Sequence, residues 1–319
     1  MRIDHPYHED ELIVQRRASE TVSAQRNGGV IADAIPKGAL RFIGQQSLAV
    51  FGSLDRGGNI WASVLVGEPG FLSAPDERTV ALDVTQRRSA EDDPFWTNIE
   101  ANEEVGMLVI DLATRRRLRI NGRIRGIDDT RFELTVGQAY PNCPKYIQRR
   151  HLPQLAAIAP TQSDATRRGV ALAEDQKALI ASADTLFVAS ANPGHGVDAS
   201  HRGGQPGFVR VLDDRRLRIP DYVGNSMFNT LGNFTAYPHA GLVFVDFDSS
   251  RALQLTGRAE IRWDQEDPNG ETGGTRRYWD LEVEQWLETP LARPLHWELL
   301  DYSPFNPKPR RRSSEEIQP

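Results

Sequence analysis

Three neighbouring segments decide the fold of this chain: GHGVDASHRGGQPGFVRV (194–211), RLRIPDYVGNSMFNTLGNFTAYP (216–238) and AGLVFVDFDSSRALQLTG (240–257). Apolar residues alternate in 207–211, 242–246 and 251–255, which predicts three strands. The segment 221–233 is rich in Gly, Asn, Ser and Thr. Its backbone amides and hydroxyls can bind an anion, with Arg202 nearby as a fixed positive charge. We therefore expect a phosphate-bearing ligand held against a sheet.

The same layout occurs a second time, about 135 residues earlier in the chain. GMLVIDLATRRRLRINGR, from Gly106, matches GLVFVDFDSSRALQLTGR, from Gly241. Four pairs keep the offset of 135: Gly106 and Gly241, Asp111 and Asp246, Arg116 and Arg251, Gly122 and Gly257. Upstream, Ser63 and Ser200 are 137 residues apart. A repeat of this length predicts two copies of one barrel.

The first copy is typical of an all-β structure. Residues 48–125 hold short apolar runs separated by Gly, Asp and Asn: LAVFGS, NIWASVLV, TVALDV, GMLVID and RLRINGRI. Asp93 followed by Pro94 indicates a helix start, because Asp is a good N-cap and Pro suits the first helical position. We expect strands with brief helical connections.

This order of motifs resembles the flavin-binding half of the pyridoxamine 5'-phosphate oxidase-like family, the FMN-binding split barrels. VDASHR (197–202) is similar to the family's strand that ends in a basic residue, and IPDYVGN and SMFNTLGN to the strand end and short helix that reach the FMN phosphate. Tyr237-Pro238 stands at the family's Asn-Pro turn, and RALQLTG is similar to the strand under the flavin. The resemblance implies a mainly β fold of two tandem FMN-binding split barrels that form a pseudo-dimer.

The resemblance also implies where FMN binds. The family's barrels bind flavin where two of them meet, and a tandem chain can build that pair within itself. The implied cofactor-binding residues lie in the second copy: Ser200, His201, Arg202, Asp221, Tyr222, Val223, Gly224, Asn225, Asn229, Thr230 and Arg251. The first copy has Leu65 at the place of Arg202, so we expect it to be a structural partner that can still donate side chains across the interface.

Some positions depart from the oxidase that names the family. Phe228-Asn229-Thr230 replaces its Ser-Arg-Lys cluster, and Ala252 replaces a glutamine. We therefore expect an FMN-dependent oxidoreductase that acts on another small organic substrate, with NAD(P)H as electron donor. No catalytic residue stands out, because the flavin itself accepts the hydride. The alternative is a non-catalytic flavin- or haem-binding protein, in which His195, His201 or His239 would be the axial ligand.

The remaining segments complete the expected domain organisation. We expect an N-terminal helical arm (1–35), the first barrel (36–150), a linker and helix (151–183), the second barrel (184–265), a helical and aromatic extension (266–305) and a disordered tail (306–319). Within the arm, 9–26 predicts one surface helix that packs on the barrel or on a second subunit. Trp279, Val283 and Trp286 recur at helical spacing, which predicts a helix in the extension. Trp297 or Arg293 is a candidate to close the flavin pocket.

Three side chains near these elements have two interpretations each. The thiol of Cys143 lies beside Lys145 in the sequence and can be an activated thiolate, but a structural cysteine is the favoured interpretation. His195 sits in a glycine-flanked loop and is either structural or an acid or base over the flavin. Arg115, Arg116 and Arg117 are expected in a solvated hairpin turn.

Composition limits the classes of function. The chain has 319 residues, a net charge of −6 and a pI near 5.7, which argues against nucleic acid as a partner. Its single cysteine, Cys143, excludes an intramolecular disulfide and a multi-cysteine metal site, and we expect no metal. No apolar run approaches the ~18 residues of a membrane span, and the polar N-terminus is unlike a signal peptide. We expect a cytoplasmic protein, with a homodimer as one possible assembly.

Overall fold

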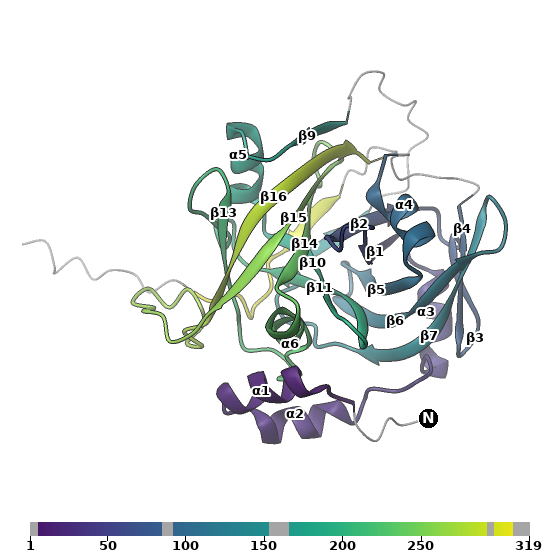
Figure 1. Cartoon of the computed structure of the whole chain (residues 1–319), viewed down its shortest axis with the longest axis horizontal. Helices are drawn as coiled ribbons and strands as arrows, with labels where there is room; N and C mark the ends of the chain where they lie inside the picture. The colour runs from purple at the N-terminus through teal and green to yellow at the C-terminus, as the bar shows by residue number, and fades with distance from the viewer. Residues whose placement is uncertain (1–5, 85–91, 153–165, 292–296, 309–319) are drawn as a thin grey trace, which may run out of the picture.

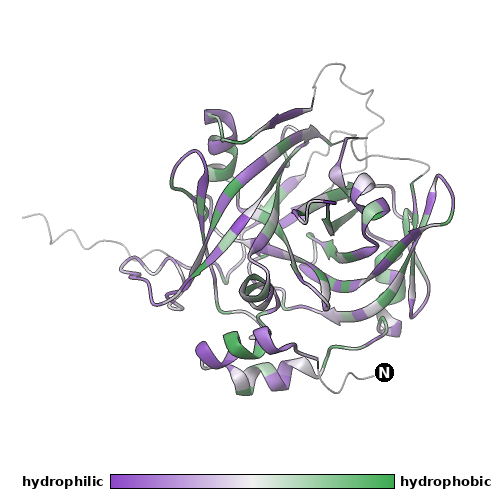
Figure 2. Ribbon diagram, viewed as in Figure 1, coloured by the Kyte–Doolittle hydropathy of each residue, from purple (hydrophilic) through white to green (hydrophobic). Residues whose placement is uncertain are grey.

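The described chain forms two large antiparallel sheets, each curved into a barrel-like half (Figure 1), and a third sheet of two short strands. A computed structural model describes residues 6–84, 92–152, 166–291 and 297–308. Hydrophobic and hydrophilic residues interleave along the long strands of both sheets (Figure 2). Each sheet has one face toward the interior of its own barrel. The strands between the two barrels are buried on their other face as well.

The first sheet has seven strands in the order β2-β1-β5-β6-β7-β4-β3. Their bounds are Leu48–Leu54 (β1), Ile60–Val66 (β2), Leu72–Asp76 (β3), Thr79–Asp83 (β4), Glu104–Asp111 (β5), Arg116–Gly126 (β6) and Arg131–Pro141 (β7). Helix α4 (Pro94–Ala101) starts where Asp93 and Pro94 predict it, and the Asp93 side chain caps it by accepting from the backbone N–H of Phe95.

The second sheet repeats this order as β11-β10-β14-β15-β16-β13-β12, with the short β9 paired to β16. The bounds are Arg167–Gly169 (β9), Thr185–Asn192 (β10), Gly196–Gly203 (β11), Arg210–Val211 (β12), Arg216–Pro220 (β13), His239–Asp246 (β14), Arg251–Arg262 (β15) and Tyr278–Pro290 (β16). Helix α5 (Glu174–Ser182) precedes β10, and helix α6 (Asn229–Ala236) takes the place of α4.

The two sheets also share their strand register. The β6–β7 ladder shifts register between Asn121 and Gly122, and the β15–β16 ladder shifts at the equivalent pair, Thr256 and Gly257. A Cβ at Gly122 would lie 2.0 Å from the carbonyl oxygen of Thr135, so only glycine fits this bulge. The predicted pair of tandem split barrels is therefore confirmed.

The barrels pack against each other through a second pair of equivalent glycines. A Cβ at Gly106 on β5 would lie 2.5 Å from the backbone of Asp198 on β11. A Cβ at Gly241 on β14 would lie 2.7 Å from the backbone of Ala62 on β2. Each glycine thus lets an edge strand of the other barrel cross closely, and a shared apolar core fills the interface between the barrels.

Two short helices, α1 (Glu9–Arg17) and α2 (Thr21–Gly28), form an N-terminal arm against α6 (Figure 1). The sequence predicts one helix here; the structure has two, because Ser19 adopts a left-handed backbone with φ 59° between them. A 3-10 turn (η1, Lys37–Ala39) and helix α3 (Leu40–Gly44) follow the arm.

The predicted helix at the end of the second barrel is wrong. Tyr278–Pro290 is strand β16, in which Trp279, Leu281 and Val283 alternate toward the core. The register shift opposite Gly257 inserts one extra residue, which turns Trp286 inward as well. A bulged strand thus imitates helical spacing.

The last described segments are short. Strand β17 (Glu298–Asp301) pairs with β8 (Arg149–His151). Trp297 and Arg293 were the two candidates to close the flavin pocket. Trp297 packs on Phe247, with 6.0 Å between the ring centroids, and Arg293 lies outside the described residues. In the described part of the chain, none of the helices has the length and apolar character that crossing a membrane requires.

Candidate functional site

A cavity of about 110 Å³ lies between the two barrels, at the end of β11. The first barrel contributes β6 and the segment after β7, with Arg117, Arg119, Asn142, Cys143, Lys145 and Tyr146. The second barrel contributes the end of β11, the 220–228 loop and the start of α6. The cavity therefore needs both copies of the repeat.

The structure gathers nine of the eleven sequence-predicted residues at this cavity: Ser200, His201, Arg202, Asp221, Tyr222, Gly224, Asn225, Asn229 and Thr230. Val223 is next to it, and its carbonyl oxygen accepts a hydrogen bond from the Tyr146 hydroxyl at 2.9 Å. Arg251 is not brought to the cavity. Its Nε donates to Glu288 Oε1 at 2.6 Å, on the β15–β16 ladder.

Sequence reasoning missed two arginines on β6. Arg117 was expected in a solvated turn, and this is wrong: its Nη2 donates to the Cys143 carbonyl at 2.5 Å, and its Nη1 lies 3.4 Å from His201 Nδ1. Arg119 Nη1 lies 3.2 Å from both Asp198 Oδ1 and Asn229 Oδ1. Alternation along β6 could have found them, since it places both on one face.

These arginines and Arg202 leave hydrogen-bond donors free beside the cavity. The buried Nε atoms of Arg117, Arg119 and Arg202 have no hydrogen-bond partner in the described structure, and neither has Nε2 of His201. Arg119 is neutralised by Asp198. Across the described residues, Arg117 and Arg202 form no ion pair, so the cavity carries excess positive charge.

Burial and mutual repulsion shape the protonation of this cluster. Burial, together with the charges of Arg119 and Arg202, lowers the pKa of Arg117 to about 9. Burial also lowers the pKa of Arg202 and, with the nearby arginines, holds the pKa of His201 well below its usual range. His201 is therefore neutral at physiological pH. An anion in the cavity would relieve the cost of these buried, unpaired donors.

The second barrel adds hydroxyls and a helix start to this cluster. Arg202 Nη1 donates to Ser200 Oγ at 3.3 Å, and Ser200 Oγ lies 3.3 Å from Thr230 Oγ1 in the first turn of α6. A helix N-terminus carries partial positive charge and free N–H groups. Arginine, hydroxyls and helix start together suit a phosphate.

Aromatic side chains line the other part of the cavity. The rings of Tyr146 and Tyr222, one from each barrel, lie 4.8 Å apart between centroids. Nearby, Lys145 Nζ lies 5.6 Å from the centroid of Phe305. Such surfaces suit a planar, polar ligand next to the anion-binding end.

The pseudo-equivalent place in the other half has lost these cations. Leu65 replaces Arg202 there, while Ala252 and Gln254 replace Arg117 and Arg119. Gln254 Nε2 donates to Ser63 Oγ at 3.0 Å, and Ser63 Oγ donates to Asp93 Oδ1 at 2.5 Å. At this place the polar side chains hydrogen-bond to one another and no arginine stands at the three equivalent positions, which supports the prediction that the first barrel is a structural partner.

The single cysteine and two predicted histidines lie at different places. Cys143 lines the cavity, and its Sγ accepts from the Lys145 backbone N–H at 3.4 Å. His195 stacks on His8 of the arm at 5.0 Å between centroids, away from the cavity lining. His239 stacks on Tyr237 at 4.4 Å, on β14.

Comparison with known proteins agrees with the fold. Residues 172–289 match the family model described as pyridoxamine 5'-phosphate oxidase. No curated protein matches the chain. Solved structures that match include HupZ of Group A Streptococcus, at 16% identity and a TM-score of 0.29, over 35% of this chain and 90% of that chain.

Two further solved structures match over a similar length. A candidate pyridoxamine 5'-phosphate oxidase from Lactobacillus delbrueckii is 17% identical, with a TM-score of 0.30, over 36% of this chain and 93% of that chain. A candidate 5-nitroimidazole antibiotic resistance protein from Bacteroides thetaiotaomicron is 9% identical, with a TM-score of 0.26, over 39% and 89%.

Fold and site together define a tandem split β-barrel protein with a cationic cavity between its barrels. Over residues 172–289, which span the sheet of the second barrel, the chain is similar to the pyridoxamine 5'-phosphate oxidase family.

Proposed function

We propose that this cavity binds FMN and that the chain is an FMN-dependent oxidoreductase. The substrate is a small organic molecule other than pyridoxamine phosphate, and NAD(P)H is the electron donor. One observation carries the proposal: Arg117, Arg119 and Arg202 all line one cavity, and the buried Nε atom of each has no hydrogen-bond partner in the described structure. A phosphate dianion matches this surplus of charge and donors.

The residues present fit FMN in type. Arg202, Ser200 and Thr230 would hold the phosphate from the second barrel, and Arg117 would approach it from the first. Tyr146 and Tyr222 would border the planar ring. When bound, FMN supplies the hydride and electron chemistry. The chain itself binds, orients and shields, and its neutral His201 offers an imidazole nitrogen without adding charge.

FMN is preferred over FAD because the site offers a single compact cationic cluster. FAD would need a second nucleotide-binding region, such as a Gly-rich strand–turn–helix motif. Gly203-Gly204 lacks that sequence context. Mass spectrometry of the ligand released by heating the purified protein tests this directly. FMN is the expected species, and recovery of FAD or of no flavin would contradict the proposal.

The electron donor is tested separately. Adding NADH or NADPH without oxygen should bleach the flavin absorbance of the loaded protein, because a bound two-electron acceptor loses its visible band on reduction. An unchanged spectrum with both nucleotides would leave FMN binding in place and remove NAD(P)H as the donor.

One observation favours a second candidate, a non-catalytic haem- or flavin-binding protein. His201 lines the cavity with a buried, unpartnered Nε2, which could bind haem iron once its proton moves to Nδ1 and the contact of Nδ1 with Arg117 Nη1 is broken. The visible spectrum separates the two ligands, since haem gives an intense Soret band. His201→Ala should abolish that band if haem is axially bound there, and should leave a flavin spectrum in place.

A further inference from the structure

The loop that borders the cavity has a strained backbone. Ser226 and Phe228 both have φ 62°, in the left-handed region that residues with a side chain rarely adopt. Phe228 is the N-cap of α6 and Asn229 is its first residue, and both line the cavity. Such a conformation persists only when its surroundings hold it.

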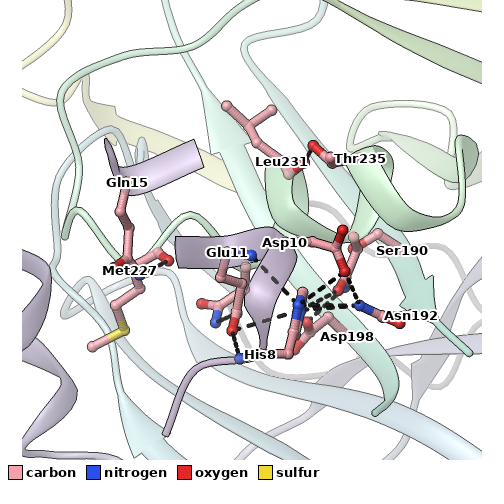
Figure 3. Close-up of polar contacts among 12 residues, drawn as sticks. His8, Asp10, Glu11, Gln15, Ser190, Asn192, Asp198, Met227, Leu231 and Thr235 are labelled. Atoms are coloured by element: carbon pink, nitrogen blue, oxygen red, sulfur yellow. Dashed lines mark hydrogen bonds and ion pairs between the residues drawn. The ribbon is translucent and has the colours of Figure 1, made fainter. Parts of the chain in front are cut away.

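The N-terminal arm holds this loop from its outer side. Gln15 Nε2 donates to the Met227 carbonyl at 3.1 Å, with the two side by side in Figure 3. Asn27 Nδ2 donates to the Asn225 carbonyl at 2.6 Å. In the opposite sense, the Ser226 hydroxyl donates to a carboxylate oxygen of Glu20 at 2.6 Å. Three successive loop residues are thus fixed by three arm side chains.

The arm is also seated directly on α6. A Cβ at Gly232 would lie 2.6 Å from Glu11 Cγ and 2.9 Å from Glu11 Cα, so glycine permits this close approach. Asn229 Nδ2 donates to Glu11 Oε1, and His8 Nε2 lies 3.1 Å from Asn233 Oδ1. His8 and Glu11 are therefore packed against the helix that begins at the cavity.

None of the described arm residues, 6–29, lines the cavity itself. We propose that the arm is a clasp: Gln15, Glu20 and Asn27 are positioning residues that hold the 225–228 loop in its ligand-binding shape and thereby set the affinity of the cavity. This inference rests on the proposed function for the identity of the ligand, FMN. The loop conformation itself can be followed without any ligand.

An arm that acts as a clasp and an arm that only adds buried contacts predict different effects of weakening the arm. If the arm only adds buried contacts, weakening it lowers the free energy of unfolding and leaves the shape of the loop unchanged. If it is a clasp, weakening it frees the loop in the folded protein and reduces ligand affinity at constant fold. Hydrogen exchange of the 221–228 amides in the ligand-free protein reports the loop directly.

The test uses two glycine variants of the full chain. Gly232→Ala places a methyl group against Glu11 and should lift α1 from α6. Gly38→Ala is the matched control, because an added Cβ there meets nothing within 4 Å. We expect Gly232→Ala to speed loop exchange and to weaken FMN binding roughly tenfold or more, as expected for the loss of two or more hydrogen bonds. Gly38→Ala should match the wild type in both measurements.

Gln15→Leu refines the test by removing one hydrogen bond with little change in volume. It should weaken FMN binding about fivefold, with faster exchange confined to the loop. Unchanged exchange and affinity in Gly232→Ala and Gln15→Leu would overturn the clasp. A wild type that does not bind FMN would overturn the proposed function alone, because loop exchange still tests the arm.

Discussion

Arg202 and Leu65 occupy the same position in the two barrels, because each pairs with the second residue of the neighbouring strand, Leu186 of β10 and Ala49 of β1. Arg202 lines the cavity, whereas Leu65 is 3% exposed and packs in the core of the first barrel. One residue difference thus separates a position that lines the cavity from a position in the core.

Arg202→Ala should weaken FMN binding by roughly ten- to a hundred-fold, because a charge-assisted hydrogen bond contributes about 1.5–3 kcal/mol. Leu65→Ala should instead lower the free energy of unfolding by about 2–5 kcal/mol, since it leaves a cavity in the core. Fluorescence titration with FMN and denaturant unfolding measure the two effects. Equal FMN retention by both variants would contradict assignment of the site to the second barrel.

The first barrel should donate a second cation. Arg117→Ala is expected to weaken FMN binding by roughly the same factor as Arg202→Ala, because both arginines line the cavity, form no ion pair within the described residues and have a buried Nε without a partner. Its neighbour Arg116 is the control: it is exposed and lies over the Phe42 ring at 4.8 Å. Arg116→Ala should bind FMN as the wild type does. If only Arg202 mattered, the site would belong to one barrel.

The fold was largely predictable from the sequence, because the repeat fixed the register of two sheets at once. The equivalent glycines at 106 and 241, and at 122 and 257, mark the interface and the bulges. The strand β16 escaped prediction because its bulge is visible only against β15. A register shift is a property of two strands, and one sequence segment does not contain it.

The site was predictable only on the side that carries the motif. Ser200, Arg202 and the 221–230 segment are close in sequence, so their proximity could be inferred. Arg117 and Arg119 come from the other copy, and their approach depends on how the barrels cross. The sequence did hold one indication. Ala252 and Gln254 stand at the places of Arg117 and Arg119, and positions that are charged in only one copy of a repeat indicate that the two copies have different roles.

Protonation of Glu11 should make arm docking depend on pH. Burial, followed by the nearby charge of Asp198, raises its pKa from an ordinary 4.5 to about 8, while Arg119 and the His8 backbone N–H act in the opposite direction. The docked state therefore binds the proton more tightly than the undocked state. Docking is strongest below pH 4.5, weakens as the pH rises toward about 8, and changes no further above that value.

The measurement compares wild type with Glu11→Gln, which cannot titrate. The free energy of unfolding of the wild type, relative to that of Glu11→Gln, should fall between about pH 5 and about pH 8 and stay constant above that range. His8, Asp198 and Arg119 are present in both proteins, so their titration largely cancels. A difference that is flat across this range would mean that Glu11 is not the group that couples docking to pH.

A single chain should hold one FMN. Both walls of the cavity come from the same chain, so binding needs no second subunit. Sedimentation of the flavin-loaded protein at falling concentration, followed at a flavin absorbance band, checks this. The expected result is a flavin-bearing monomer at the lowest concentrations. Release of FMN in step with dissociation of a dimer would show that the functional interface lies between chains.

Joining the barrels in one chain gives each interface position its own codon. In a dimer of identical barrels, an arginine introduced at one site appears at both, and the second copy must also be accommodated in the interior. Here the place of Arg117 is Ala252 in the other half, and the place of Arg119 is Gln254. The half that contains the cavity can therefore carry several arginines. The other half can carry residues that pack and hydrogen-bond within the protein.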